Sequence, residues 1–328
     1  MPSDLPAMAS PIGLSPASPR LPNFLVLGAM KAGTTALYYY LRQHPQIYLN
    51  AGRKEAQFFC NEGRPPRFTG PGDDDVNRYV ISSIDEYRQM FAGAGAEPAV
   101  GEVGTVYLYV PGSEERIRHH VPDARLFAIL RDPVERAYSS FLHLARERLE
   151  PCRDFAEAVR REPERRRQGW SPHWHYLEAG FYADQVRRYL KAFDRHQLRF
   201  YLYDDYAANP VATLQDMFRF LRVDDAFVPD VRLRHNVAGV PRSHRLHHFL
   251  DRPHLVKRLL RPLLSSERRL AVRERLRALN LRRPPRLRRE MRRHLIGVYQ
   301  DDVHALEELL ERDLSPWLDP ERIASDPS

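Results

Sequence analysis

A glycine loop with one internal lysine is the first feature of this sequence that could do chemistry. The stretch G-A-M-K-A-G-T-T spans residues 28–35. Phosphate-binding loops of nucleoside triphosphatases read G-x-x-x-x-G-K-[ST]. Gly28 and Gly33 have that spacing, but Thr34 stands where those enzymes have lysine, and the only lysine of the stretch, Lys31, lies inside the loop. The loop therefore predicts a site for a phosphate compound that needs its lysine in a different place.

The residues on either side predict a strand before the loop and a helix after it. The run N-F-L-V-L-G at 23–28 is continuous and apolar, as in a buried strand, and residues 34–45 predict a helix that ends before Pro45. The N-terminus of such a helix offers N–H groups and the positive end of its dipole to an anion. The loop is thus placed where a phosphate group would be stabilised.

Strands and helices continue to alternate along the chain. Further strands are expected at 99–102, 124–131 and 198–206, and helices at 113–122, 133–147, 181–193, 209–221 and 294–310. Residues 61–78, rich in Gly, Pro, Arg and Asp, are expected to form a surface loop. This alternation predicts an α/β protein with a P-loop-like three-layer fold, in which helices cover both faces of a central, mainly parallel sheet.

The composition is that of a globular protein, with 43% hydrophobic and 10% aromatic residues among 328. We expect a disordered leader at 1–20, one domain at 21–318 and a tail at 319–328. The start of the chain lacks a signal-peptide pattern, and no apolar run is long enough to cross a membrane. The two cysteines, Cys60 and Cys152, make neither a disulfide framework nor a four-ligand metal site, so we expect a cytoplasmic protein without metal, whether or not the two pair.

Positive charge is concentrated in one segment, residues 232–293. It contains 20 lysines and arginines against four aspartates and glutamates. Such a segment is either a solvated helical surface or a face for an acidic partner, such as an anionic glycan, an anionic membrane or a nucleic acid. Contact with a membrane would make the protein peripheral to it.

Four short patterns together carry a resemblance to a known family. They are the glycine loop, G-R-K-E-A-Q-F-F (52–59), G-E-V-G-T-V-Y-L (101–108) and L-R-D-P-V-E-R-A-Y-S-S-F (130–141). In this combination they resemble sulfotransferases that use 3′-phosphoadenosine 5′-phosphosulfate (PAPS), especially the heparan-sulfate-type enzymes and their bacterial relatives. The resemblance extends from about residue 22 to about residue 318 and implies one sulfotransferase domain.

The resemblance implies how the donor PAPS would be held. Lys31 would reach the oxygen that bridges sulfur and phosphorus and stabilise its developing negative charge. The 5′-phosphate would be held by the loop and the start of the helix, that is by Ala32, Gly33, Thr34 and Thr35. Arg131 and Ser139 would bind the 3′-phosphate, with Ser140 as the rival hydroxyl. No metal is needed, because the leaving group is already a stable anion.

The resemblance also implies a catalytic base, Glu55. This glutamate precedes an aromatic pair, as in the heparan-sulfate-type enzymes, and would take the proton of the acceptor hydroxyl. The adjacent Lys54 would bind the moving sulfuryl group or the acceptor. The chain departs from the family where Ala56 and Gln57 replace a Pro-His pair and where Val103 replaces a lysine found in some glycan enzymes. These departures leave the acceptor, and a glycosaminoglycan in particular, undecided.

Other residues are assigned to the acceptor or to a closing loop. Glu102 and Tyr107 either line the acceptor cleft or pack at the sheet edge, and Trp170 and Trp174, with His173 and His175, either cover the acceptor or form a packed loop. The segment H-N-V-A-G-V-P-R-S at 235–243 is expected to close the nucleotide site through three residues: Asn236, Arg242 and Ser243.

The sequence therefore predicts an enzyme that transfers a sulfuryl group from PAPS to a hydroxyl, or less readily an amine, of a carbohydrate, glycolipid or small metabolite. One alternative is a kinase-like enzyme that uses a nucleoside triphosphate, although the lysine of its loop pattern is missing. Another is a nucleic-acid-binding protein that uses segment 232–293, which would leave the four patterns unexplained. A third is a non-catalytic member with the same fold. We expect PAPS and a hydroxyl-bearing acceptor as partners, and no nucleic acid.

Overall fold

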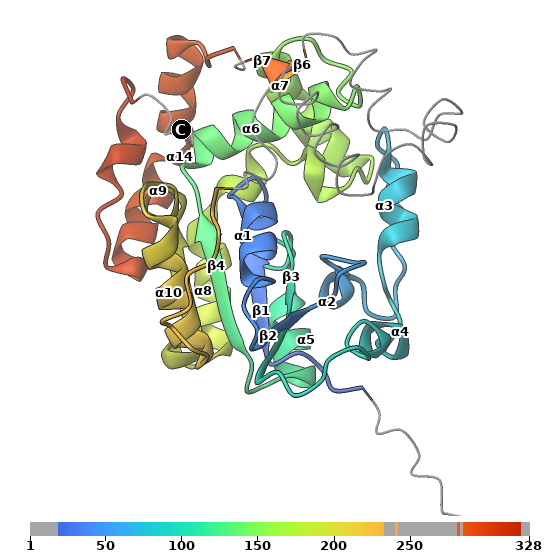
Figure 1. The fold of residues 1–328 in the computed structure, drawn as a ribbon. Coiled ribbons are helices and arrows are strands. Elements are labelled where there is room, and N and C mark those ends of the chain that lie inside the picture. Colours follow the sequence, from blue (N-terminus) through green and yellow to red (C-terminus); the bar gives the residue numbers. More distant parts are fainter. Residues whose placement is uncertain (1–18, 233–239, 242–280, 283–284, 323–328) are drawn as a thin grey trace, which may run out of the picture.

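A parallel sheet forms the centre of the protein (Figure 1). The computed structural model describes residues 19–232, 240–241, 281–282 and 285–322. The five strands have the order β2-β3-β1-β4-β5, and each strand runs parallel to its neighbours. Their bounds are β1 Phe24–Gly28, β2 Ile47–Leu49, β3 Ala99–Val103, β4 Arg125–Leu130 and β5 Leu198–Leu202. The predicted α/β fold with a central parallel sheet is confirmed.

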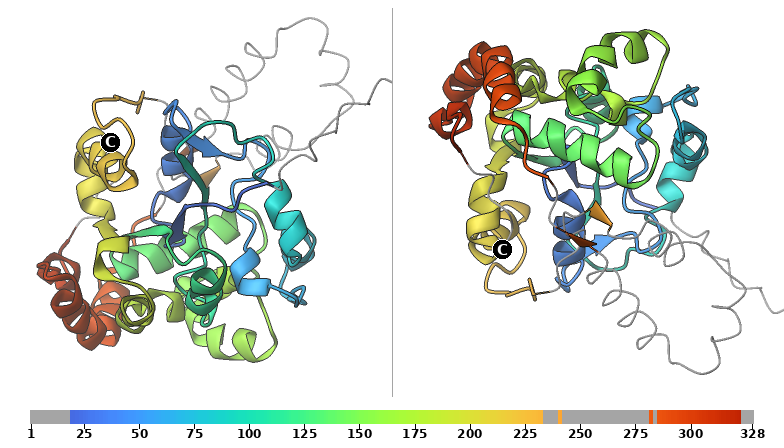
Figure 2. Two further views of the ribbon diagram at one scale, coloured as in Figure 1. Left: turned by 90° about the horizontal axis from the view of Figure 1, so that it is seen from below. Right: turned by 90° about the horizontal axis from the view of Figure 1, so that it is seen from above.

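Helices cover both faces of this sheet, as Figures 1 and 2 show. On one face lie α1 (Thr34–Leu41) and α10 (Pro210–Leu221), and His44, just after α1, packs against Phe218 of α10 with ring centroids 4.6 Å apart. On the other face lie α5 (Ser113–His120) and α8 (Tyr182–Ala192), and α14 (Arg289–Leu310) packs outside α8. Both faces of the sheet are therefore buried, which explains why its strands are continuous apolar runs.

The remaining elements lie at the edges and ends of the sheet. In Figure 1, α6 and α7 lie beyond the end of β4, and α3 and α4 lie beyond β2 and β3. The bounds of these elements are α2 Phe58–Asn61, α3 Asp73–Tyr79, α4 Ile84–Gln89, α6 Pro133–Arg146, α7 Phe155–Arg167, α9 Tyr203–Ala208, β6 Val240–Pro241 and β7 Leu281–Arg282. The last two strands form a separate antiparallel pair.

Two expectations about local structure need correction, and one strand was not expected. The strand expected at 198–206 ends at Leu202, and residues 203–208 form α9, whose first turn contains two aspartates that favour a helix N-terminus. The loop expected at 61–78 contains most of α3, which also begins with aspartates. Strand β2 was not expected, because its three residues are too few to show a pattern.

The order of the strands fixes where a ligand would bind. The chain runs from β1 outward to β2, returns to β3 beside β1, and then crosses to β4 on the other side of β1. The crevice at the carboxyl ends of the strands, next to such a reversal of direction, is where open α/β sheets bind ligands. The loops that follow β1, β3 and β4 meet there, and they carry the motifs that the sequence singled out.

Candidate active site

The glycine loop joins β1 to α1 through residues in left-handed conformations. Lys31 has a φ of 66° and Gly33 a φ of 84°. Gly28 brings the end of β1 close to the segment after β3, because a Cβ on this glycine would lie 2.9 Å from the carbonyl oxygen of Thr105. The loop therefore turns at the carboxyl end of β1, the central strand, and presents the first N–H groups of α1 at that end of the sheet.

Lys31 lies half-buried among other positive groups. Burial, together with the nearby charges of Arg146, Arg131 and Lys54, lowers the pKa of its ammonium group to about 7. Four cations thus converge on one part of the crevice. An anion bound among them would relieve their mutual repulsion, so the electrostatics favour a phosphate or sulfate group at this place.

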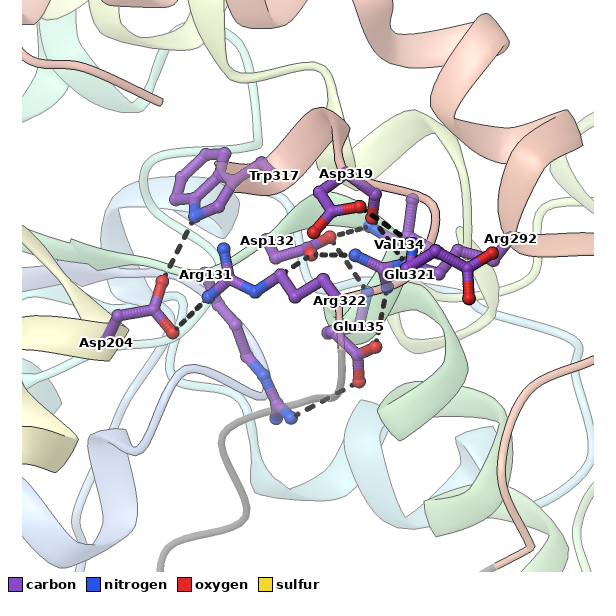
Figure 3. Close-up of polar contacts among 10 residues, drawn as sticks. All are labelled: Arg131, Asp132, Val134, Glu135, Asp204, Arg292, Trp317, Asp319, Glu321 and Arg322. Atoms are coloured by element: carbon purple, nitrogen blue, oxygen red, sulfur yellow. Dashed lines mark hydrogen bonds and ion pairs between the residues drawn. The ribbon is translucent and has the colours of Figure 1, made fainter. Parts of the chain in front are cut away.

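Arg131, at the end of β4, points back toward the loop. Its Nη1 atom donates to the carbonyl oxygen of Lys31 over 3.1 Å, and its guanidinium lies 4.7 Å from the ring centroid of Tyr203. Its ion pair with Glu135 is long, at 4.0 Å (Figure 3). Among the described residues no carboxylate lies closer than this to the guanidinium, so Arg131 has donors left for an anionic ligand.

Asp132 and Glu135, which follow Arg131, are held by the C-terminal helix (Figure 3). Asp132 caps α6 by accepting from the N–H of Val134 at 2.9 Å. Arg292 of α14 donates to Asp132 Oδ2 at 2.9 Å and to Glu135 Oε1 at 2.8 Å. Arg292 belongs to the basic segment 232–293, yet it is buried inside the protein. The expectation of a solvated or partner-facing segment is therefore wrong for this residue.

Replacing Arg292 with lysine should destabilise the protein, because an ammonium group cannot bridge both carboxylates as the planar guanidinium does. The loss of one hydrogen bond between charged groups should lower the free energy of unfolding by about 1.5–3 kcal/mol, measured by urea denaturation. Arg293→Lys is the matched control, since the neighbouring side chain is 59% exposed and pairs with Glu321 at the surface. Equal stability of the two variants would refute a structural role for the Arg292 pairs.

Glu55, Lys54 and the start of α1 lie together across the crevice. The Nζ atom of Lys54 donates to Thr34 Oγ1 over 3.3 Å and lies 3.7 Å from Glu55 Oε1. The hydroxyl of Thr105, after β3, donates to the other carboxylate oxygen of Glu55 over 2.6 Å. The structure therefore joins Glu55, Lys54, Thr34 and Thr105 through hydrogen bonds and an ion pair, and these four residues are called the Glu55 group below.

Glu102 and Tyr107 lie beneath this group and not in the cleft. Glu102 is 1% exposed and accepts from the N–H of Ala56 at 2.6 Å and from the hydroxyls of Tyr87 and Tyr107. Burial raises its pKa to about 7. Because Tyr107 is also fully buried, neither side chain is placed for the expected contact with an acceptor. Glu102 instead holds the backbone at Ala56, next to Glu55.

The structure adds two residues that sequence reasoning did not assign to the site, Arg146 and His143, and brings His173, for which a role in covering the acceptor was considered, close to them. Arg146 acts on the pKa of Lys31, and its Nη2 atom lies 3.0 Å from Nδ1 of His143. Burial lowers the pKa of His143 to about 2, with Lys31 and Arg146 as further causes, and burial also lowers the pKa of His173. The helical spacing from Ser139 to His143 and Arg146 was a usable signal, because positions i, i+4 and i+7 share one face.

The other expected site residues divide into three groups. Ser139 is half-buried on α6, on the face that carries His143 and Arg146. Trp174 is buried and Trp170 half-buried, their ring centroids are 4.8 Å apart, and Arg165 stacks on both rings. Asn236, Arg242 and Ser243 lie outside the described residues.

None of the helices in residues 19–232 and 285–322 is both long and apolar enough to span a bilayer. Within the same residues, no group of three or more His, Cys, Asp or Glu side chains could hold a metal ion.

Comparisons with known proteins agree with the motifs. A family model described as the sulfotransferase family matches residues 113–227. The chain is 35% identical to a sulfotransferase from Alicyclobacillus acidocaldarius and superposes on its crystal structure with a TM-score of 0.72. The superposition covers 92% of this chain and 100% of the Alicyclobacillus chain.

Two curated relatives are much longer than this chain. The membrane-associated sulfotransferase kil1 of Dictyostelium discoideum is 34% identical over 37% of this chain. The human bifunctional heparan sulfate N-deacetylase/N-sulfotransferase 3 is 31% identical over 62% of it. In each case the match spans 22% of the relative.

Proposed function

This chain belongs to the sulfotransferase family, and we propose that it transfers a sulfuryl group from PAPS to a hydroxyl group of an acceptor. The reaction joins the acceptor oxygen to sulfur while the bond between sulfur and the 5′-phosphate oxygen breaks. The electron pair of that bond stays on the phosphate oxygen, and the hydroxyl proton passes to a base. The products are a sulfate ester and 3′-phosphoadenosine 5′-phosphate (PAP).

The observation that carries this proposal is the convergence of Lys31, the Glu55 group and Arg131 at the carboxyl ends of the inner strands β1, β3 and β4. Arg131 donates to the backbone of Lys31, and Lys54 joins Thr34 to Glu55. This arrangement has cations for two phosphates and a sulfuryl group, and a carboxylate on the opposite side for a proton. General base, leaving-group stabiliser and anion site are the three things that such a transfer requires.

We assign the roles as follows. Glu55 accepts the proton of the acceptor, and Thr105 and Lys54 keep its carboxylate in place. Lys31 stabilises the leaving 5′-phosphate, which is also bound by the N–H groups and hydroxyls at the start of α1: Ala32, Gly33, Thr34 and Thr35. Arg131 and Ser139 bind the 3′-phosphate, and Asn236, Arg242 and Ser243 close over the nucleotide.

The acceptor is proposed to be a carbohydrate, a glycolipid or a small metabolite. One relative is a heparan sulfate enzyme and another is membrane-associated, which favours acceptors that carry sugars or lie near a membrane. A cytoplasmic location, with the basic segment 232–293 against a membrane or an anionic glycan, stays a prediction.

Binding of PAP without magnesium is the direct test of the nucleotide site. PAP should raise the melting temperature in the presence of a chelator, because a ligand that binds only the folded state stabilises it by mass action. ATP should raise it much less, since it lacks the 3′-phosphate. Differential scanning fluorimetry measures both shifts. Equal shifts for ATP and PAP, or a strict need for magnesium, would favour a kinase-like enzyme.

The same assay includes a variant of the 3′-phosphate site. Arg131→Ala should weaken PAP binding by about 1.5–3 kcal/mol, the usual contribution of a hydrogen bond to a charged group. Arg161→Ala is the control, because Arg161 is an exposed arginine of α7 that pairs with Glu157 at the surface. If Arg131→Ala binds PAP as tightly as the control does, Arg131 has no part in the site.

A further inference from the structure

A cavity lies next to the chain segments that carry Glu55 and Thr105. Its volume is about 340 Å³, a size typical of sites for small organic ligands. It is lined by residues of four segments: Gln57, Cys60, Asn61, Phe68, Val106, Tyr109, Val110, Pro111, Trp170, Pro172 and His175. Trp170 and His175, for which the sequence offered a role in covering the acceptor, are among these residues, and the roles proposed for the others do not involve the cavity.

Two wall segments of the cavity are continuous in the chain with Glu55 and Thr105. Glu55 and Thr105 are joined by a hydrogen bond, and the residues just beyond them, Gln57 and Val106, line the cavity. Val106 also packs in one apolar cluster with Met30, which precedes Lys31 in the glycine loop. The cavity therefore adjoins both the proposed base and the loop that would hold the leaving group.

A third wall segment, residues 170–175, also comes close to Glu55 and Lys31. Trp170, Pro172 and His175 line the cavity, and His173, between them, is close enough to Glu55 and Lys31 for both charges to act on its pKa. A ligand in the cavity thus lies between this segment and the Glu55 group. An acceptor whose hydroxyl reaches Glu55 would place its next atoms there.

The lining carries no net charge. Of the described residues that form it, none is Asp, Glu, Lys or Arg. Burial lowers the pKa of His175 to about 4 and raises that of the Cys60 thiol to about 12, so both are neutral near pH 7. The Tyr109 hydroxyl and His175 Nδ1 already pair over 2.7 Å. A sulfate or carboxylate of a polyanionic glycan would lose its hydration here without gaining a cation.

We infer that this cavity binds an uncharged, largely apolar part of the acceptor, such as the alkyl or aromatic aglycone of a glycoside. The inference rests on the proposed sulfuryl transfer and narrows its substrate class to amphiphilic alcohols, whose hydroxyl lies at Glu55 and whose apolar part contacts Trp170, Phe68 and Val106. Aromatic and aliphatic walls gain most from removing apolar surface from water.

The test compares two neutral probes that differ only in their apolar part, hexyl β-D-glucoside and methyl β-D-glucoside. With PAP bound to the full chain, isothermal titration calorimetry should show the hexyl compound binding at least about tenfold more tightly, with a negative heat-capacity change. Equal affinities of the two glucosides would overturn the inference.

Variants of the wall make the test specific. Val110→Asp places a carboxylate in the half-exposed wall and should abolish most of the hexyl preference, and Phe68→Ala should reduce it by removing apolar contact. Val228→Asp is the control, since this valine is 62% exposed and outside the cavity. A hexyl preference that persists in both wall variants would place the apolar site elsewhere.

The outcomes separate this inference from the proposed function. If PAP does not stabilise the protein, the sulfotransferase assignment fails, whatever the glucosides do. If PAP binds and sulfuryl transfer proceeds to a polyanionic glycan such as heparosan, while the hexyl group adds no affinity, the assignment stands and the apolar acceptor is wrong.

Discussion

Replacing Glu55 with glutamine should lower turnover by about 10²-fold or more while PAP affinity stays near that of the wild type. Glutamine keeps the size of the side chain and can still accept the hydrogen bond that Thr105 now donates over 2.6 Å. It cannot take a proton from the acceptor. Turnover is measured as transfer of radiolabelled sulfur from PAPS to the best acceptor of a panel, and PAP affinity by the melting-temperature shift.

Two comparisons decide how this result is interpreted. Glu86→Gln is the matched control, because Glu86 is an exposed glutamate 3.8 Å from Arg53, and it should leave turnover unchanged. If Glu55→Gln keeps most of its activity, the base lies elsewhere. Glu102 is then a poor replacement, because its carboxylate is buried and accepts hydrogen bonds from Ala56, Tyr87 and Tyr107. An acceptor that ionises without help, such as a phenol, would then be indicated.

The parts of the fold that could be predicted from sequence are those encoded in contiguous residues. Strand β1, the glycine loop and α1 form one uninterrupted pattern, and their order fixed the α/β class. The end of β5 and the start of α9 could not be separated, because Tyr203 is apolar enough for either element. The three residues of β2 show no period, and their strand exists through pairing with β3.

The site also contains residues that a contiguous pattern could predict and residues that only the fold brings together. Lys31, Glu55 and Arg131 could be proposed from the sequence because each lies in a short pattern that resembles a motif of the family. Arg292 could not, because it looks like any other arginine of segment 232–293, and only the docking of α14 onto α6 brings it to Asp132. Trp170 and His175 were considered as a cover for the acceptor, but the cavity that they line was not predicted, because it is formed by four segments whose side chains meet only in the fold.

Replacing Lys31 with methionine should lower turnover by about 10²–10³-fold, the usual effect of removing one group that stabilises developing charge. Methionine has a side chain of similar length without the ammonium group, so the loop keeps its shape. Unlike Glu55→Gln, this variant should also weaken PAP binding, because the positive charge acts on the bound phosphate as well as on the transition state. The two variants therefore differ in the nucleotide titration and not only in the rate.

The pH dependence of PAP affinity identifies Lys31 more specifically. In the free protein the pKa of Lys31 is about 7, since burial and the charges of Arg146, Arg131 and Lys54 disfavour its protonated form. A bound anion favours that form and raises the pKa, so PAP binding takes up a proton above pH 7. Affinity should be nearly constant below pH 7 and fall above it, by as much as about tenfold per pH unit, until the pKa of the complex is reached. The phosphates of PAP do not interfere, because their last pKa is about 6.

Titrations from pH 7.5 to pH 9 in the wild type and in Lys31→Met check this expectation. The wild type should lose affinity across that range, whereas Lys31→Met should bind weakly throughout and show little change. Lys191→Met is the control, because Lys191 is exposed on α8, and it should behave as the wild type does. A wild-type slope that survives in Lys31→Met would assign the proton to another group, with Glu102 first to be examined, since its pKa is also about 7. A flat wild-type profile would mean that PAP binding does not change the protonation of Lys31 between pH 7.5 and pH 9, and the proposed coupling between this proton and the phosphate would then be wrong.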